Sequence, residues 1–429
     1  MKISKQRAIV YIGLFLVLLL GFMTFSTPIN TSYARFIVPL IGIVLLSMHA
    51  QKYGRIVINK SLFITWCCLV LPVLYKNYDI YNGNLINVVY YVLFFCLAII
   101  MSKISDWYSE MWKVLVGFTG FHFMAGVFLL MNKEILLSRV LPMLNLTTNG
   151  YNLLMNCIKN GYMTGLCNHY SVMGVFMAIG VIAASGCTFS YNYLKKKVEL
   201  IIFLVFVIGL VMTGKRGVLV FSLSAIFIVN RMFSERKLTN SQLKRIIGTG
   251  VLFLMVFVVA YYKIPQVKSI IFRFTENTEN LNDMSTGRVE LFWVNALTMF
   301  KNRPLLGNGW RSFRRQIVSV FGNSNPNDAH NIYLQLLAET GIVGSFLVIY
   351  FMFKTMMITY KGIKIAILSD ENSKRITIPL KQSLTFQLFF VLYGLTGNPL
   401  YDMNCYLPYL MSCVMAWSYY VGHKSRFNR

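Results

Sequence analysis

The sequence predicts an all-α, polytopic membrane protein with about twelve transmembrane helices and one long, structured extracytoplasmic loop. Two observations predict this fold class. Of the 429 residues, 56% are hydrophobic and only 13% are charged, whereas soluble domains contain roughly 25% charged residues. The apolar residues also gather in runs that approach the about 20 residues needed to cross a bilayer. We expect residues 1–429 to form a single membrane domain.

Twelve apolar runs predict membrane spans, several of them short and flanked by side chains that would reach the interface. The first run follows Met1–Arg7 without a small-residue cleavage site, so we expect a first span and not a cleaved signal peptide. The predicted spans lie near residues 8–25, 34–49, 61–75, 85–102, 112–131, 166–188, 198–213, 217–231, 246–262, 338–359, 382–397 and 403–421.

The positive charges favour one orientation in the membrane. The chain has 41 Lys and Arg against 15 Asp and Glu, for a net charge of +26. In a soluble protein this excess would suggest nucleic-acid binding. With the N-terminus in the cytoplasm, however, 24 of the 41 basic residues fall in the inner segments or at the span ends that border them, as the positive-inside rule requires. We therefore expect both termini to be cytoplasmic, the long loop to face outward, and no nucleic-acid partner.

The eight cysteines do not form a metal-binding or disulfide framework. No CxxC pair occurs, and most of the cysteines lie within apolar runs, where thiols pack as small hydrophobic groups. We expect no metal site. Cys157 and Cys167 lie near a predicted outer segment, and whether they pair stays open at this point.

Residues 263–338 form the predicted extracytoplasmic loop. Apolar residues between Val289 and Phe300 recur at i, i+3, i+4 and i+7, which predicts an amphipathic helix. Arg303-Pro304 would end this helix, and Gly307–Trp310 would form a tight turn. A second loop helix is expected from about Ala329 to Thr340, with Gly341 as its C-terminal stop.

The loop is where we expect the chemistry, because the bilayer core tolerates few ionised groups. Such amphipathic helices would lie at the outer interface with their aromatic faces toward lipid. An arginine guanidinium matches the oxygens of a phosphate in a bidentate way. A histidine titrates near neutral pH, so His330 is a candidate general base.

Taken together, several short motifs in the loop resemble the O-antigen ligase and polymerase superfamily. Outside the loop, Thr213–Gly217 resembles the family's arginine-bearing break between two short spans, and Gly165–His169 resembles its Asn-containing start of an earlier span. The resemblance covers about residues 160–350. The loop motifs are, in order, Thr286–Arg288, Trp293, Asn302–Gly309, Asp328–Leu334 and Ala338–Gly344.

The resemblance implies a glycosyltransferase that uses an undecaprenyl-diphosphate-linked glycan and needs no metal ion or other cofactor. Carried over by position, Arg216 and Arg288 would bind the diphosphate, and His330 would be the base that activates an acceptor hydroxyl. Lys215 stands where relatives usually have serine. It would add a phosphate contact or alter which lipid donor fits. Six further residues are candidates for glycan or lipid contacts, namely Arg311, Arg314, Tyr333, Trp310, His169 and Asn168.

Each candidate also has a structural interpretation. Arg216 would reach to headgroups, His169 would cap a helix, and Tyr333 and Trp310 would belong to an interfacial aromatic belt. Glu339 is expected to orient the loop helix and not to act as an acid. Gly307-x-Gly309 lacks the strand and helix of a nucleotide-binding fold and is interpreted as a turn.

The favoured function is a polymerase of the bacterial inner membrane that joins lipid-linked repeat units into surface polysaccharide, such as O-antigen or capsule. The closest rival is a ligase that moves the polysaccharide onto a lipid A core. A lipid-linked oligosaccharide flippase is the rival from another class, but it would line a central cavity with charges inside the spans. The expected partners are the lipid-linked donor and acceptor, the bilayer, a chain-length regulator and a flippase.

Overall fold

The computed structural model describes residues 5–22, 34–53, 58–78, 86–104, 107–143, 146, 148–167, 169–189, 197–233, 289–322, 327–368, 373–423 and 427. These residues form helices and the turns between them, and no strand occurs among them. The all-α fold class is confirmed over this part of the chain. The ninth expected span, 246–262, lies outside the described residues, so the number of twelve spans stays a prediction.

Each of the other expected spans falls on a helix, because the apolar runs that the sequence shows are the segments that form helices. These helices are α1 (Lys5–Leu19), α2 (Ala34–Ala50), α3 (Lys60–Leu74), α5 (Ile86–Met101), α6 (Trp107–Met131), α10 (Tyr170–Ala184), α11 (Lys197–Met212), α12 (Arg216–Met232), α18 (Ile332–Leu368), α19 (Ser373–Tyr393) and α20 (Met403–Gly422). Short elements connect them, namely η1 (Leu20–Phe22), η3 (Gln51–Tyr53), α7 (Lys133–Ile135), η4 (Leu136–Val140), α8 (Leu141–Met143), α9 (Thr148–Lys159) and η5 (Ser185–Cys187).

Among the described residues, three helical segments are long and apolar enough to cross a membrane. They are α6, the continuous stretch Tyr170–Cys187, and α18. Four shorter apolar helices lie in α1, α2, α3 and α5. Their short length agrees with the short apolar runs of the sequence. By length and composition, these helices indicate a membrane protein.

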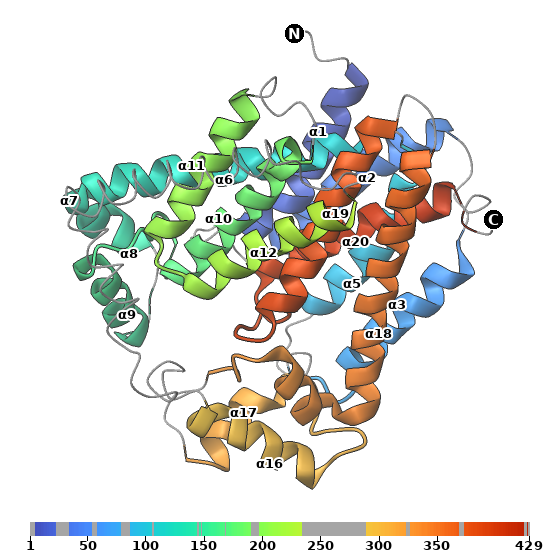
Figure 1. Ribbon diagram of the computed structural model, residues 1–429. Coiled ribbons are helices and arrows are strands. Elements are labelled where there is room, and N and C mark those ends of the chain that lie inside the picture. The colour runs from blue at the N-terminus through green and yellow to red at the C-terminus, as the bar shows by residue number, and fades with distance from the viewer. Residues whose placement is uncertain are drawn as a thin grey trace.

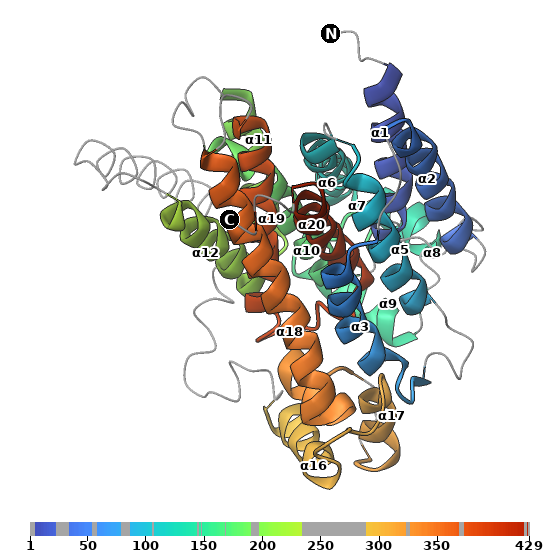
Figure 2. The ribbon, with the colours of Figure 1, turned by 90° about the vertical axis from the view of Figure 1, so that its right-hand side faces the viewer.

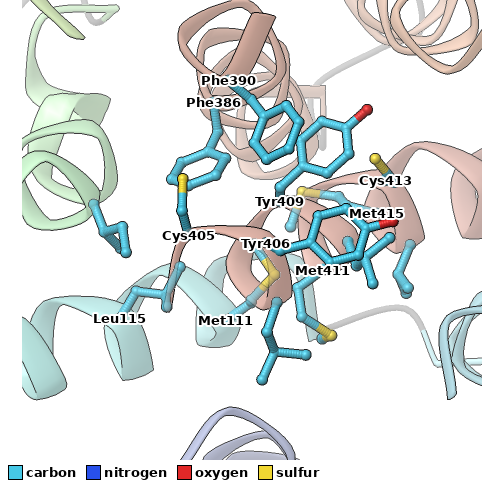
Figure 3. Close-up of a cluster of buried hydrophobic side chains, with 14 of the residues drawn as sticks. Met111, Leu115, Phe386, Phe390, Cys405, Tyr406, Tyr409, Met411, Cys413 and Met415 are labelled. Atoms are coloured by element: carbon cyan, nitrogen blue, oxygen red, sulfur yellow. The ribbon is translucent and has the colours of Figure 1, made fainter. Parts of the chain in front are cut away.

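Helix α20 lies at the centre of the bundle, and its residues from Cys405 to Tyr419 are all buried. Figure 3 shows Phe390 of α19 packed against Tyr409 and Phe386 beside Cys405. The rings of Phe390 and Tyr409 stack with centroids 3.8 Å apart. Between helices in a bilayer, such close van der Waals packing is a main source of stability, because lipid and side chains are equally apolar.

A buried glutamine joins three helices of the bundle. The Gln387 side chain of α19 accepts a hydrogen bond of 2.9 Å from the Thr359 hydroxyl of α18. Its amide nitrogen donates to the Ser383 hydroxyl at 3.1 Å and to the Ser412 carbonyl of α20 at 3.3 Å. The polar atoms of this amide are therefore satisfied inside the protein, as an apolar surrounding requires.

The loop elements form a separate layer at one end of the bundle, where α18 begins (Figures 1 and 2). They are η7 (Val289–Trp293), α16 (Val294–Asn302) and α17 (Ser312–Ser319). The amphipathic helix expected around residues 289–300 is present, and it ends before Arg303 as expected.

The apolar face of η7 and α16 packs into a small core within the loop. We expected this face to lie toward lipid, and for its buried residues that expectation is wrong. Phe292, Ala296 and Met299 are buried against Phe313 and Ile317 of α17. Ala329 and Ala338 complete the same cluster. The loop helices thus stabilise one another, and this gives the segments around them a fixed backbone.

The second loop helix begins three residues later than expected. α18 starts at Ile332, and the Asn331 side chain accepts hydrogen bonds from the backbone N–H groups of Tyr333 and Leu334. Gly341 interrupts the helix with φ 64° and ψ −168°, so it does stop the loop helix. The chain then continues directly into the long apolar part of α18, which extends to Leu368.

Candidate functional site

Two of the loop motifs lie side by side and are joined by backbone hydrogen bonds. The N–H of Ile342 donates to the Pro304 carbonyl at 2.8 Å, and the N–H of Gly309 donates to the Glu339 carbonyl at 2.7 Å. The Asn308 amide nitrogen adds bonds to the carbonyls of Met299 (3.0 Å) and Ala338 (2.9 Å). Segments 304–309 and 338–343 therefore form one rigid unit.

Two glycines make this close approach of backbones feasible. Gly307 and Gly341 have φ values of 68° and 64°, in the left-handed region that favours glycine. A Cβ atom on Gly307 would collide with the backbone of Glu339, and one on Gly341 would collide with the backbone of Leu305. Gly307 and Gly341 are thus needed for chain packing, and the left-handed φ of Gly307 agrees with the interpretation of Gly307-x-Gly309 as a turn.

The carboxylate of Glu339 is fully buried and accepts hydrogen bonds from four donors. Two of them are the backbone N–H groups of Arg311 (2.9 Å) and Phe313 (3.1 Å), at the N-terminus of α17. The others are the Gln335 amide at 3.1 Å and the Tyr401 hydroxyl at 2.8 Å. Burial raises the pKa of Glu339 to about 7, although the hydrogen bonds from Tyr401, the Arg311 N–H and Gln335 oppose this rise. Through its bonds to the backbone N–H groups of Arg311 and Phe313, Glu339 orients α17.

A second buried carboxylate, Asp328, lies two residues before His330. Both of its oxygens accept hydrogen bonds from the Arg314 guanidinium, and the Gln335 amide donates to it at 3.0 Å. Burial raises the pKa of Asp328, but the hydrogen bonds and charge of Arg314 lower it by more. The pKa therefore lies below its ordinary value, and the carboxylate stays ionised at neutral pH.

His330 is held in a backbone conformation that is uncommon for a histidine. Its φ is 54°, in the left-handed region, and such residues concentrate at functional sites. The carbonyl of the preceding Ala329 accepts a hydrogen bond of 3.0 Å from the Trp293 indole. The imidazole lies edge-on to the Phe292 ring, with centroids 6.1 Å apart. Trp293 thus bonds to the residue before His330, and its neighbour Phe292 contacts the imidazole.

The other candidate cations lie at the break between α11 and α12. Gly214 turns the chain with φ 69°, and the Tyr162 ring packs against it. Arg216 is the first residue of α12 and is partly buried. The Lys215 ammonium donates a hydrogen bond of 2.9 Å to the Ser171 hydroxyl at the start of α10. Lys215 is therefore a contact between helices as well as a candidate phosphate ligand.

The short connection between α19 and α20, residues 394–402, contacts both of these regions. The Gly394 carbonyl accepts a hydrogen bond of 2.9 Å from the N–H of Ile332, two residues after His330. Near Arg216, a Cβ atom on Gly217 would lie 3.3 Å from the Thr396 hydroxyl. The loop and the α11–α12 break therefore face the same connection, which no motif of the sequence had indicated.

Asp402 is a further titratable group of this connection that sequence reasoning did not consider. Its side chain caps α20 by accepting the Asn404 N–H at 3.0 Å. Burial raises its pKa, while the hydrogen bonds of Asn404 and the charge of Lys215 oppose this rise. A span boundary with one acidic residue gives little signal in a sequence, so this residue was not distinguishable from an ordinary cap.

Most of the candidate sugar-contacting residues have partners inside the protein. Arg311 donates to the Tyr401 carbonyl at 3.1 Å and lies over the Tyr401 ring. Trp310 is buried and stacks on the same ring at 5.0 Å. The Tyr333 hydroxyl donates to the Val391 carbonyl at 2.8 Å, and Arg314 binds Asp328. These contacts build the site, and they favour a structural role for each of the four residues.

Of the three remaining candidates, the structure describes one, His169. His169 caps α10, because its Nδ1 atom accepts the Ser171 N–H at 3.1 Å, as its structural interpretation anticipated. Arg288 and Asn168 lie outside the described residues.

Cys157 and Cys167 are not joined by a disulfide, and all eight cysteines of the chain are thiols. Over the described residues, no group of three His, Cys, Asp or Glu side chains is placed to hold a metal ion.

Comparison with known proteins finds a family match for part of the chain. Residues 201–349 match the family model described as O-antigen ligase. This part of the chain is O-antigen ligase-like. The matched range contains the α11–α12 break, His330 and the 338–343 segment, and it ends before the 394–402 connection. The resemblance stated from the motifs is confirmed over this range. A search of curated proteins gives no match.

Proposed function

We propose that this chain is a glycosyltransferase of the bacterial cytoplasmic membrane that polymerises undecaprenyl-diphosphate-linked repeat units into a surface polysaccharide. One observation carries the proposal furthest. His330 and the Lys215–Arg216 pair belong to segments that contact the same connection, residues 394–402. The segments that carry a base and two cations thus contact one short connection, and an acceptor hydroxyl and a leaving diphosphate require those groups.

In the proposed reaction, side chains accept the proton that is released and stabilise the negative charge that develops. A ring nitrogen of His330 accepts the proton of an acceptor hydroxyl, and the oxygen attacks the anomeric carbon of the donor sugar. The bond from that carbon to the diphosphate oxygen breaks, and undecaprenyl diphosphate leaves with the electron pair. Arg216, Arg288 and Lys215 stabilise the negative charge that grows on the diphosphate. Cationic side chains in this role make a metal ion unnecessary to the proposal.

The ligase rival uses the same donor and the same side chains with a different acceptor, a lipid A core. The flippase rival needs charges along a central path, and it gives no role to the constrained His330. We therefore propose polymerase as the function, with both termini in the cytoplasm and the loop on the outer face. A chain-length regulator and a flippase are its proposed partners.

The test is a gel of surface polysaccharide from a strain that lacks this gene, complemented with wild type or with His330→Ala. The proposal expects a ladder from wild type and single repeats from both the null and His330→Ala. Long polymer that stays on the carrier lipid in the null would identify a ligase. No glycan at the outer face would favour the flippase. A full ladder from His330→Ala would remove His330 as the base.

A further inference from the structure

The side chain of Gln335, in the loop part of α18, is fully buried and uses both ends of its amide. Its nitrogen donates hydrogen bonds to the carboxylates of Asp328 (3.0 Å) and Glu339 (3.1 Å). Its oxygen accepts the backbone N–H of Ala329 at 3.0 Å. One neutral side chain thus lies between two buried carboxylates and supplies a donor to each.

These contacts fix the two residues immediately before His330. The Asp328 carboxylate is held by Gln335 and Arg314, and Ala329 is held through its N–H by Gln335 and through its carbonyl by Trp293. The Asp328 carboxylate and the backbone of Ala329, which precede His330, are therefore each held by two side chains. Because that backbone conformation is unfavourable for a histidine, the surrounding contacts must maintain it.

We propose that Gln335 is a positioning residue for His330. It holds the Asp328–Ala329 backbone so that the imidazole points in one direction, and turnover depends on it although it is buried beneath the loop. This inference rests on the proposed function, in which His330 is the base. A displacement of a reacting group by about 1 Å costs on the order of 100-fold in rate.

The chemistry of the amide explains why no other side chain would serve equally. Methionine has a similar length, but it would leave both carboxylates without their shared donor and the Ala329 N–H without an acceptor. Glutamate would keep the acceptor for Ala329 and place a third carboxylate between Asp328 and Glu339. Gln335→Met and Gln335→Glu therefore remove different parts of the same arrangement.

The experiment measures kcat and KM of purified protein in lipid nanodiscs. The substrate is the lipid-linked repeat unit extracted from the strain that lacks this gene. We expect Gln335→Met to lower kcat about 10- to 100-fold with KM changed by less than about 3-fold. Gln335→Glu should also lower kcat, and the two variants together keep the test open if one of them does not fold.

The matched control is Gln387→Met, which removes the other hydrogen-bonded, fully buried glutamine described above, from α19 in the bundle. It should lose a similar amount of thermal stability and keep the wild-type kcat. The second control is the double variant of His330→Ala and Gln335→Met. If Gln335 acts through His330, the double variant has the activity of His330→Ala alone.

Different outcomes separate this inference from the proposed function. Loss of turnover in His330→Ala with wild-type kcat in Gln335→Met would overturn the inference alone. A further drop in the double variant, or a kcat loss of equal size in Gln387→Met, would show a general structural effect and overturn it as well. Wild-type turnover in His330→Ala would overturn the assignment of the base and, with it, the role of Gln335.

Discussion

The Tyr401 hydroxyl donates a hydrogen bond of 2.8 Å to the buried carboxylate of Glu339. The same carboxylate accepts the backbone N–H groups of Arg311 and Phe313 at the first turn of α17. One side chain of α18 therefore joins the loop helix to the α19–α20 connection. Since the loop carries His330 and the connection borders Arg216, this contact sets how the two parts of the site face each other.

Replacing Glu339 should therefore destabilise the protein strongly. Glu339→Leu leaves several buried donors without an acceptor, at about 1–3 kcal/mol for each, and we expect a total loss of about 3–5 kcal/mol. Tyr401→Phe removes one donor and should cost about 1–2 kcal/mol. Unfolding of the purified protein in detergent measures both, with Glu134→Leu at an exposed position as control. Equal stability of Glu339→Leu and the control would contradict the assignment.

The glycines of the loop allow a graded test of backbone packing. Gly307→Ala and Gly341→Ala combine a left-handed φ with a collision against backbone atoms. Gly322 has φ 66° and open space around its Cβ position, so Gly322→Ala should cost only the conformational strain of about 1–2 kcal/mol. Gly120 lies in helix α6 with open space, and Gly120→Ala should stabilise by about 0.5–1 kcal/mol.

The expected order of melting temperatures follows from these differences. Gly120→Ala should be highest, then wild type, then Gly322→Ala, and then the two colliding variants. A Gly341→Ala protein as stable as Gly322→Ala would show that the loop backbone relaxes freely, and the rigid unit of segments 304–309 and 338–343 would have to be abandoned.

Much of the fold was predictable because apolar runs determine where helices form in a membrane protein. The start of α18 was not. Asp328 and Asn331 are both good helix caps by residue type, and the chain uses Asn331 because Arg314 and Gln335 occupy the carboxylate of Asp328. Such long-range contacts leave no periodic signal, so local sequence patterns do not distinguish the two caps.

The sequence named candidate residues for the site but did not indicate which partners their side chains meet. Residue type suggested glycan or lipid contacts for Arg314 and Tyr333, yet their hydrogen bonds go to Asp328 and to the Val391 carbonyl. A side chain's chemistry limits what it can bind, whereas the partner it meets depends on the tertiary structure. The 394–402 connection illustrates the same point, since its importance comes only from what packs against it.

The ion pair of Asp328 and Arg314 predicts how stability depends on pH. Folding depresses the pKa of Asp328, so the pair stabilises the protein above the unfolded-state pKa of about 3.9 and loses this effect as pH falls through the lower folded-state value. The melting temperature of wild type should exceed that of Asp328→Asn at pH 5, and this difference should shrink as the pH falls below about 4. Glu134→Gln is the exposed control. A difference that stays constant down to pH 3 would count against an ionised Asp328.

The proposed orientation in the membrane is tested with a membrane-impermeant maleimide on intact cells. Lys301 of α16 and Arg375 of α19 are both exposed. We predict that Lys301→Cys is labelled from outside and that Arg375→Cys is labelled only after the cells are opened. The parent protein with its native cysteines gives the background. Labelling of Arg375→Cys on intact cells would reverse the topology and place the loop in the cytoplasm.

The geometry of the guanidinium predicts that the two arginines proposed to bind diphosphate do not tolerate lysine. Arg288→Lys should be nearly as damaging as Arg288→Ala, because a point charge lacks the fork that meets two phosphate oxygens. Lys215 already places a point charge beside Arg216 and uses it on Ser171, so another ammonium would not replace what Arg216 offers. The ladder gel measures each variant, with Arg139→Ala at an exposed position as control. Wild-type ladders from Arg288→Lys together with loss in Arg288→Ala would mean that charge alone suffices at that position.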